Sequence, residues 1–286
     1  MTAAILPSAT ARTRWRWKWL LLRRLSQAGV LGLFLLGPWA GIWVVKGNLS
    51  SSLVLDVLPL TDPFVLLQVI ASGHRPEATA LLGAAIVVAC YLLLGGRAYC
   101  GWVCPVNVVT DAAAWLRERL GLRTRARPLR SARYWLLGVL LAASALAGAT
   151  VWEWVNPVSL LHRGLIFGLG LGWTVVLAVF LFDLLVTPRG WCGHLCPMGA
   201  TYSLIGAGSL LRVRADGRAR CDDCMECFRV CPEPQVLQPA LKGAAQGVGP
   251  VITGSNCSNC GRCIDVCDPG VFRFGTRLHN KLEASP

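Results

Sequence analysis

The sequence predicts an α-helical integral membrane protein that ends in a small, cysteine-rich α+β domain. The 286 residues are 54% hydrophobic and only 15% charged, with a mean hydropathy of +0.52, and soluble proteins of this length are rarely so apolar. Long apolar segments recur between residues 25 and 186, and eight of the 13 cysteines fall in two short runs near the C-terminus. These observations predict the fold class.

Four apolar segments are each within or close to the roughly 17–25 residues that a membrane helix needs. The expected spans are residues 25–45, 78–94, 134–151 and 165–186. The first span is longer than the apolar part of a secretion signal, which favours an uncleaved helix over a twin-arginine export signal at Arg23-Arg24. The expected domains are a basic and aromatic tail (1–19), a membrane domain (20–211) and a C-terminal domain (212–286).

Basic residues are distributed unevenly among the segments that join these spans. The segment 95–133 holds eight basic and two acidic residues, a net charge of +6, whereas segment 46–77 holds two basic and three acidic residues, a net charge of −1. The positive-inside rule then places both termini and segment 95–133 in the cytoplasm, with the chain in a bacterial inner membrane. This topology accounts for the formal net charge of +13, so no nucleic-acid partner is expected.

The two cysteine runs have the spacing of iron–sulfur ligands. They read CDDCMECFRVCP from Cys221 and CSNCGRCIDVCDP from Cys257, each with the spacing C-x2-C-x2-C-x3-C. In two-cluster ferredoxins the fourth cysteine of such a run ligates the other cluster. Zinc ribbons and disulfide frameworks, the alternatives, do not have this spacing. We therefore expect one [4Fe–4S] cluster on Cys221, Cys224, Cys227 and Cys267, and a second on Cys257, Cys260, Cys263 and Cys231.

A nine-residue motif occurs twice, as RAYCGWVCP at 97–105 and RGWCGHLCP at 189–197. Two hairpins of the same sense would bring both copies to one face of the membrane. The expected fold is therefore four transmembrane helices in two repeated hairpins, followed by a bacterial-type two-[4Fe–4S] ferredoxin domain. A C-x3-C spacing puts two thiols on one face of a helical turn. Four cysteines are thus candidates for a third redox or metal centre, with strained disulfides or simple core packing as the alternatives: Cys100, Cys104, Cys192 and Cys196.

Two carboxylates are candidates for proton handling. Asp183 lies in the fourth span, where an ionisable group indicates function by default, although a structural role is the alternative. Glu153, between Trp152 and Trp154, would accept a proton from a quinol, or it is a solvated acid in an aromatic belt. The four histidines lie outside the spans and no C-x-x-C-H motif occurs, so no haem is expected.

Several segments together resemble the NapH family, the membrane ferredoxin-type quinol dehydrogenase subunits of periplasmic nitrate reductase systems. They are GPWAGIWVVKGNLSSSLVLDVLPLTDPF, WEWVNPVSL, the two C-G-x-x-C-P motifs and the paired cysteine runs, and they extend from about residue 19 to 274. The C-terminal region of NosR, MauN and CcoG-type proteins share the C-x3-C-P pattern. The resemblance implies an electron-transfer subunit rather than a stand-alone enzyme. It would take electrons from the quinone pool and pass them through a periplasmic NapG-like partner towards nitrate reductase, with a NapC-like cytochrome as a further candidate partner.

Two other functions fit the same residues. One is a cytoplasm-facing metal reductase that binds and reduces copper at the C-x3-C-P thiols, and the other is an assembly or maturation factor that uses the clusters.

The expected topology raises a physical problem for electron transfer to a periplasmic nitrate reductase. The clusters are expected in the cytoplasm, about 30 Å of hydrocarbon away from a periplasmic reductase. Either quinol and the cysteine motifs bridge that distance, or the clusters receive cytoplasmic electrons for another purpose.

Overall fold

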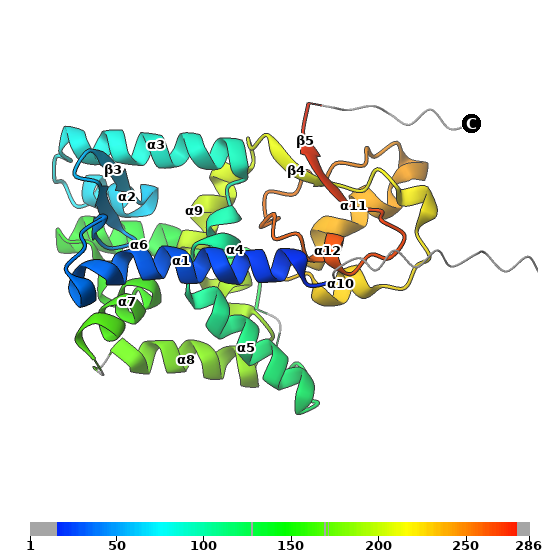
Figure 1. Ribbon diagram of the computed structural model, residues 1–286, viewed down its shortest axis with the longest axis horizontal. Helices are drawn as coiled ribbons and strands as arrows, with labels where there is room; N and C mark the ends of the chain where they lie inside the picture. Colours follow the sequence, from blue (N-terminus) through cyan, green and yellow to red (C-terminus); the bar gives the residue numbers. More distant parts are fainter. Residues whose placement is uncertain (1–15, 127, 169, 171, 279–286) are drawn as a thin grey trace, which may run out of the picture.

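The structure is a computed structural model that describes residues 16–126, 128–168, 170 and 172–278. A helical half and a cysteine-rich half lie end to end along the long axis of the molecule (Figure 1). The helical half is built around four longer helices that run roughly along this axis: α1 (Lys18–Ala40), α3 (Ala78–Leu94), α6 (Ala132–Ala147) and α8 (Gly172–Leu185).

The helical half contains a similar order of elements twice. In the first repeat, α1 leads into a three-stranded antiparallel sheet of β1 (Val45–Gly47), β2 (Ser51–Val54) and β3 (Leu58–Thr61). The short helix α2 (Pro63–Ala71) follows the sheet, and α3 is followed by α4 (Ala98–Trp102) and α5 (Val106–Arg119). In the second repeat, α6 and α8 are accompanied by the 3-10 turn η1 (Val151–Trp154), α7 (Pro157–Phe167), the π-helical turn η2 (Trp191–Leu195) and α9 (Pro197–Gly206).

The short helices α2 and α7 both begin at a proline that follows a polar capping residue. The side chain of Asp62 accepts a hydrogen bond of 2.7 Å from the backbone N–H of Phe64, and that of Asn156 accepts one of 3.1 Å from Val158. Proline suits the first position of a helix because its missing N–H would be unpaired there anyway. Both helices lie at the end of the helical half that is remote from the cysteine-rich half (Figure 1).

The observed helices differ from the expected spans at several ends. The second span coincides with α3, but α1 starts at Lys18 and ends at Ala40, where Gly41 takes a left-handed φ of 72°, a common helix stop. The third span is shorter than expected, because α6 ends before Gly148. The fourth, 165–186, is not one helix: α7 ends ahead of Gly168, whose φ of 90° breaks the helix, and α8 follows.

Length and composition qualify one helix in the described part of the chain as a membrane span, namely α1. The other three long helices are apolar but have 17, 16 and 14 residues. A topology with four membrane crossings therefore stays a prediction. Of the expected tail, residues 1–15 lie outside the described residues, and Lys18 and Trp19 belong to α1.

The cysteine-rich half is closed by a two-stranded antiparallel sheet of its first and last segments, β4 (Leu211–Arg214) and β5 (Arg273–Thr276). Its core packs Val213, Leu237, Ile252 and Phe272 around several of the cysteines. Short helical turns lie between the strands: η3 (Arg218–Arg220), α10 (Glu226–Val230), η4 (Pro234–Val236), α11 (Leu237–Lys242), η5 (Ala244–Gln246) and α12 (Arg262–Asp265).

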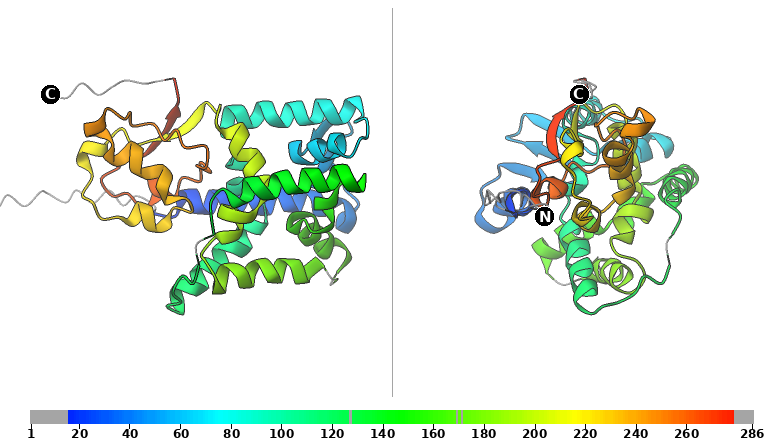
Figure 2. Two further views of the ribbon diagram at one scale, coloured as in Figure 1. Left: turned by 180° about the vertical axis from the view of Figure 1, so that it is seen from behind. Right: turned by 90° about the vertical axis from the view of Figure 1, so that its right-hand side faces the viewer.

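The start of α1 is attached to the cysteine-rich half. The carboxylate of Asp265 accepts hydrogen bonds from the backbone N–H groups of Trp19 and Leu20, at 3.0 and 3.1 Å. These are two of the four N–H groups that a helix leaves unpaired at its start. The ring of Trp19 also packs edge-on against Phe274, with 4.7 Å between centroids. The first helix of the chain thus begins on the cysteine-rich half (Figure 2).

Candidate redox site

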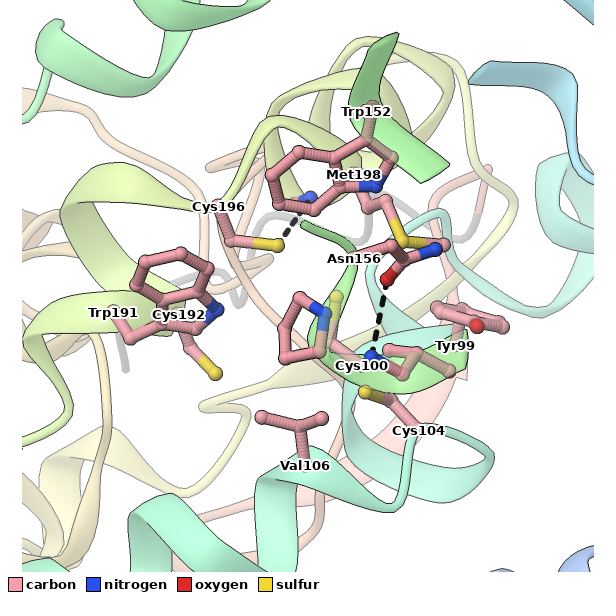
Figure 3. Close-up of a pocket in the computed structure, with 13 residues that line it drawn as sticks. Tyr99, Cys100, Cys104, Val106, Trp152, Asn156, Trp191, Cys192, Cys196 and Met198 are labelled. Carbon is pink, nitrogen blue, oxygen red and sulfur yellow. Dashed lines mark hydrogen bonds between the residues drawn. The ribbon is translucent and has the colours of Figure 1, made fainter. Parts of the chain in front are cut away.

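The four cysteines of the repeated motifs line one pocket, although 92 positions separate the two copies of the motif (Figure 3). Cys100 comes from α4, Cys104 from the turn after it, Cys192 from η2, and Cys196 from the N-cap of α9. All four are free thiols in the structure. The structure therefore brings together the residues that the sequence marked as candidates for a third centre.

Local backbone geometry turns each pair of thiols towards the pocket. In the first motif the backbone N–H of Cys104 donates to the carbonyl of Tyr99 at 3.0 Å, and in the second that of Cys196 donates to Trp191 at 2.9 Å. The second bond closes a wide π-helical turn, a form that is rare and frequent at functional sites. The sulfur of Cys196 also accepts a hydrogen bond from the backbone N–H of Gly199 at 3.5 Å.

The environment of the four thiols disfavours their negative form. Burial raises the pKa of the Cys196 thiol to about 12, and it also raises the pKa of Cys104 and Cys192. Burial raises the pKa of Cys100 too, although the nearby guanidinium of Arg97 acts against it. Because thiolates are the metal-binding form, a metal in this pocket would have to displace the protons.

Glu153, a candidate from the sequence, is linked to this pocket through Asn156. The Asn156 side chain lines the pocket, and its Nδ2 donates to Glu153 Oε1 at 2.8 Å. The hydroxyls of Ser50 and Ser159 also donate to the Glu153 carboxylate, at 3.1 and 2.8 Å. Glu153 itself is only partly buried. A hydrogen-bonded route therefore leads from the pocket to a carboxylate with access to the surface.

Asp183 is placed differently from Glu153. It is fully buried near the end of α8, and its Oδ1 accepts a hydrogen bond of 2.9 Å from the backbone N–H of Trp191. Its other oxygen has no partner among the described residues. Asp183 thus fixes the start of the turn that carries Cys192, and so helps to position that thiol.

A second buried carboxylate in the helical half, Asp62, is not among the candidates predicted from the sequence. Its Oδ2 accepts a hydrogen bond of 3.0 Å from the hydroxyl of Tyr202, whose ring stacks on Tyr99 with 4.5 Å between centroids. Burial raises the pKa of Asp62 to about 6. A signal for it was present, because TDPFVLLQ around Asp62 and VNPVSLLH around Asn156 are a second internal repeat.

The cysteines of the ferredoxin-like runs are gathered in the other half of the molecule. Four of them line a second pocket that is otherwise largely apolar: Cys231, Cys257, Cys260 and Cys263. These are the residues expected to hold the second cluster, and a soft donor set in an apolar cavity fits an iron–sulfur cluster. Burial raises the pKa of the Cys227 thiol to about 11, and the neighbouring Cys267, Cys221 and Cys224 raise it further. Those are the four residues expected to hold the first cluster.

The second cysteine pocket lies beside the repeated motifs. A Cβ atom at Gly101 would be 3.2 Å from the carbonyl oxygen of Ser258 and 3.7 Å from Cβ of Cys260. The indole N–H of Trp102 donates to the carbonyl of Asn259 at 3.0 Å. The glycine of the first motif therefore permits a close approach of the loop that carries Cys257 and Cys260.

Two buried arginines tie the same contact together. Arg97 donates to Glu233 Oε1 at 2.6 Å, to the carbonyl of Asn256 at 3.1 Å and to that of Cys192 at 2.8 Å. Arg133 contacts Glu233 at 3.3 Å and also bonds the side chain of Asn256. One polar cluster thus touches the second motif and both segments of the second cysteine pocket.

Among the described residues, no three histidine, cysteine, aspartate or glutamate side chains are arranged to hold a metal ion. A tetrahedral ion with metal–sulfur bonds of about 2.3 Å needs its sulfurs about 3.8 Å apart. The cysteine sulfurs around an iron–sulfur cluster lie farther apart than this, because they surround a cluster of several atoms and not a single ion.

Comparison with known families gives matches for both halves. A family model described as a 4Fe-4S binding domain matches residues 78–123 and 166–215, and one described as a 4Fe-4S dicluster domain matches residues 220–271. The first match contains the four cysteines of the repeated motifs, and the second contains the eight of the ferredoxin-like runs. No solved structure was found to match the chain.

Curated relatives match over nearly the whole length. The chain is 50% identical to the ferredoxin-type protein NapH of Haemophilus influenzae, over 91% of both chains. It is 51% identical to NapH of Escherichia coli, over 90% of this chain and 89% of the relative. It is 58% identical to the methylamine utilization ferredoxin-type protein MauN of Methylorubrum extorquens, over 90% of this chain and 88% of the relative. The predicted resemblance is confirmed, and the chain belongs to the family of NapH and MauN ferredoxin-type proteins, iron–sulfur proteins of electron transfer.

Proposed function

We propose that this protein is a membrane-bound electron-transfer subunit that takes electrons from a quinol. It passes them, through a NapG-like ferredoxin-type partner, towards a periplasmic nitrate reductase. The observation that carries this proposal is the contact between the four-thiol pocket and the second cysteine pocket at Gly101. It places candidate redox groups of the helical half directly beside those of the ferredoxin domain.

An inside-out distribution of polarity supports the membrane location. Large apolar side chains are exposed on the long helices, among them Leu25, Leu82 and Leu146, whereas the polar side chains of Gln68 in α2 and Asp183 in α8 are fully buried. Apolar surface of this kind belongs against lipid, and ionisable groups at membrane depth face the interior of a bundle. The 17 residues of α3 reach about 26 Å at 1.5 Å per residue, close to the roughly 30 Å of a bilayer core. Four crossings would leave both termini in the cytoplasm.

Quinol oxidation releases two electrons and two protons, so the site must dispose of both. The eight ferredoxin cysteines would hold two [4Fe–4S] clusters, which carry single electrons. Asn156 would orient a quinol hydroxyl, and Glu153 behind it would accept the two protons one after the other, each with the loss of one electron. The partial exposure of Glu153 gives each proton a way out before the next is released.

The nitrate system is the finer part of the proposal. NapH and MauN relatives are similarly close to the chain, at 50–58% identity. Ferredoxin-type electron transfer is what these two groups of relatives have in common. The nitrate-type partner is proposed from the loop segments that resemble NapH.

Anaerobic electron paramagnetic resonance of the purified protein, before and after addition of a reduced quinol, tests the proposal. Cluster signals should appear with quinol and reach the intensity obtained with dithionite. Clusters that respond to dithionite, but ignore quinol even with the periplasmic partner present, would refute a quinol-oxidising function.

A second candidate function, reduction of a metal ion, is favoured by the free thiols of the same pocket. Thiolates select soft ions such as Cu(I). This function requires copper bound in proportion to the protein and released when Cys100 and Cys192 are replaced by serine. Purified protein without copper, and without copper uptake on reduction, would exclude it.

A further inference from the structure

We infer that Arg212, at the start of the ferredoxin domain, is the counter-charge of the second [4Fe–4S] cluster and raises the midpoint potential of that cluster. Arg212 lies on β4, and the next residue of the strand, Val213, lines the second cysteine pocket. The inference deepens the proposed function and rests on its assignment of this cluster to the four cysteines of that pocket. It does not depend on which molecule supplies the electron.

The guanidinium group of Arg212 is buried without a carboxylate partner. Arg212 is 1% exposed. Within the described part of the chain, its side chain donates only to backbone carbonyls, those of Gly206, Ala207, Ser209 and Gly254. The buried Arg97, by contrast, forms an ion pair with Glu233. A buried charge without an opposite charge is strongly destabilising, so the position of Arg212 indicates an anion nearby.

The segment that carries Cys257 lies against this arginine. Arg212 Nη1 donates to the carbonyl of Gly254 at 3.2 Å, and Arg97 Nη1 donates to the carbonyl of Asn256 at 3.1 Å. Two buried guanidinium groups therefore hold the residues just before Cys257. Burial raises the pKa of the Cys257 thiol to about 11, and the same two guanidinium groups act in the opposite direction. Both charges are thus within electrostatic reach of the sulfur.

A positive charge at this place acts on the potential of the cluster. A [4Fe–4S] cluster held by four thiolates is an anion, and its reduction adds one more negative charge. The Coulomb energy grows with the charge, and it is larger in apolar surroundings than in water. Val213, Val236 and Leu237 supply such surroundings in the second pocket. Arg212 therefore stabilises the reduced form more than the oxidised form, which raises the midpoint potential.

The first cysteine run has a different environment. Cys224 is exposed, and so are the two aspartates before it, Asp222 and Asp223. The positive charge beside this run, Lys242, is also exposed and is paired with Asp223. Water screens such exposed charges. Loss of the Arg212 charge should therefore change the potential of one cluster and leave the other unchanged.

Arg212 also bonds carbonyls at the end of α9, which a purely structural role would explain. Cations stabilise the C-terminal end of a helix in this way. Arg117 makes the equivalent contact at the end of α8, where it is 4% exposed and donates to the carbonyls of Leu184 and Val186. Arg117 is not among the residues that line the two cysteine pockets. It is therefore the matched control for a structural role.

Redox titration of the anaerobically purified full-length protein with dithionite, followed by electron paramagnetic resonance, tests the inference. The signal of the second cluster is the one that persists in Cys224→Ser, which replaces an exposed ligand of the first cluster. In Arg212→Gln the equilibrium constant for its reduction should fall about tenfold or more, which is about 59 mV towards more negative potential for one electron. The other signal should not move.

Arg117→Gln should lower stability without changing either potential. Equal potentials of the second cluster in wild type and Arg212→Gln would overturn the inference, and so would a shift of the same size in Arg117→Gln. Arg212→Lys keeps the test valid if Arg212→Gln does not fold, because it retains the charge but makes fewer bonds to carbonyls. Its stability should fall while its potential stays close to that of the wild type. A potential that falls together with stability in this variant would contradict the inference.

Iron analysis of the same samples separates failure of the inference from failure of the proposed function. Two [4Fe–4S] clusters require about eight iron atoms per chain. A wild type with less iron than this would remove the assignment of the second cluster, and both proposals with it. A full iron content with no shift in Arg212→Gln refutes the inference alone. Reduction by quinol is measured separately, so clusters that ignore quinol refute the proposed function and leave the role of Arg212 standing.

Discussion

Arg97 of the first C-G-x-x-C-P motif forms an ion pair with Glu233 of the ferredoxin domain, with 2.6 Å between Nη1 and Oε1. Both side chains are about 95% buried, and Arg133 approaches the same carboxylate oxygen at 3.3 Å. The second motif differs, because its Arg189 pairs with Asp111 on α5. The arginines at the first position of the two motifs therefore make different contacts. Arg97 fastens the ferredoxin domain to the helical half, whereas Arg189 pairs within the helical half.

The variant Glu233→Gln should lower the free energy of unfolding by about 3–5 kcal/mol, because it leaves Arg97 and Arg133 buried without a counter-charge. Thermal and denaturant unfolding in detergent measure this loss. The matched control is Glu226→Gln, which removes an exposed partner of Arg229 and should change stability by less than about 1 kcal/mol. Equal effects of the two variants would show that the buried pair does not fasten the halves together.

The pH dependence of stability should carry a contribution from Asp62. Burial raises its pKa from 3.8 to about 6, so the folded state binds more protons than the unfolded state between these values. The free energy of unfolding should therefore fall by up to about 3 kcal/mol as pH rises from about 4 to 6. Above that range this group should change it little.

The variant Asp62→Asn, which copies Asn156 of the second repeat, should remove this dependence and raise stability at pH 7. The control Asp56→Asn affects an exposed carboxylate paired with Lys46, and should leave the pH profile unchanged. Unfolding curves measured from pH 4 to 8 decide the point. An unaltered slope in Asp62→Asn would mean that the buried carboxyl titrates like an ordinary aspartate.

The variant Glu153→Gln should slow quinol-driven reduction of the clusters by about 10²-fold or more, because general base catalysis contributes roughly 10²–10⁴-fold. Reduction by dithionite should be unaffected, since it needs no proton acceptor at this site. The matched control is Glu77→Gln, whose exposed carboxylate accepts a hydrogen bond from the exposed hydroxyl of Thr79. Stopped-flow spectroscopy measures both rates, and a wild-type quinol rate in Glu153→Gln would remove this residue from the proton route.

The variant Gly101→Ala should weaken the contact between the halves. The new methyl group would lie 3.2 Å from the carbonyl oxygen of Ser258, and overpacking of this kind costs typically about 1–3 kcal/mol. Gly138→Ala in α6 is the control, because nothing lies within 4 Å of its Cβ position and alanine is the better helix former. Hydrogen exchange of the 257–260 loop should rise in Gly101→Ala alone.

Several features could be predicted from the sequence because they depend on neighbours along the chain. The C-x2-C spacing indicates cluster ligands whatever the rest of the fold, and apolar runs such as 78–94 indicate buried or membrane helices. The repeated motif likewise predicted two related hairpins. These properties are local, so periodicity and spacing carry them.

Other features depend on glycine conformations and on contacts between distant segments. The break at Gly168 divides an apolar run that reads as one helix, and the sheet β1–β3 occupies a segment that was expected only as a loop. Asp62 went unnoticed because its importance comes from Tyr202, 140 residues away. The sequence around a charged residue in a loop does not indicate which distant side chain it will contact in the folded protein.

The sequence by itself thus determined the family, the iron–sulfur chemistry and the duplication of the C-x3-C-P motif. Only the tertiary structure brought Cys100 and Cys104 together with Cys192 and Cys196 in one pocket, and set that pocket against the loop of Cys257 and Cys260. The physical reason is that ligand spacing is fixed by the geometry of a single helical turn. The meeting of two such turns is decided by how the long helices pack, and by the buried ion pair of Arg97 with Glu233.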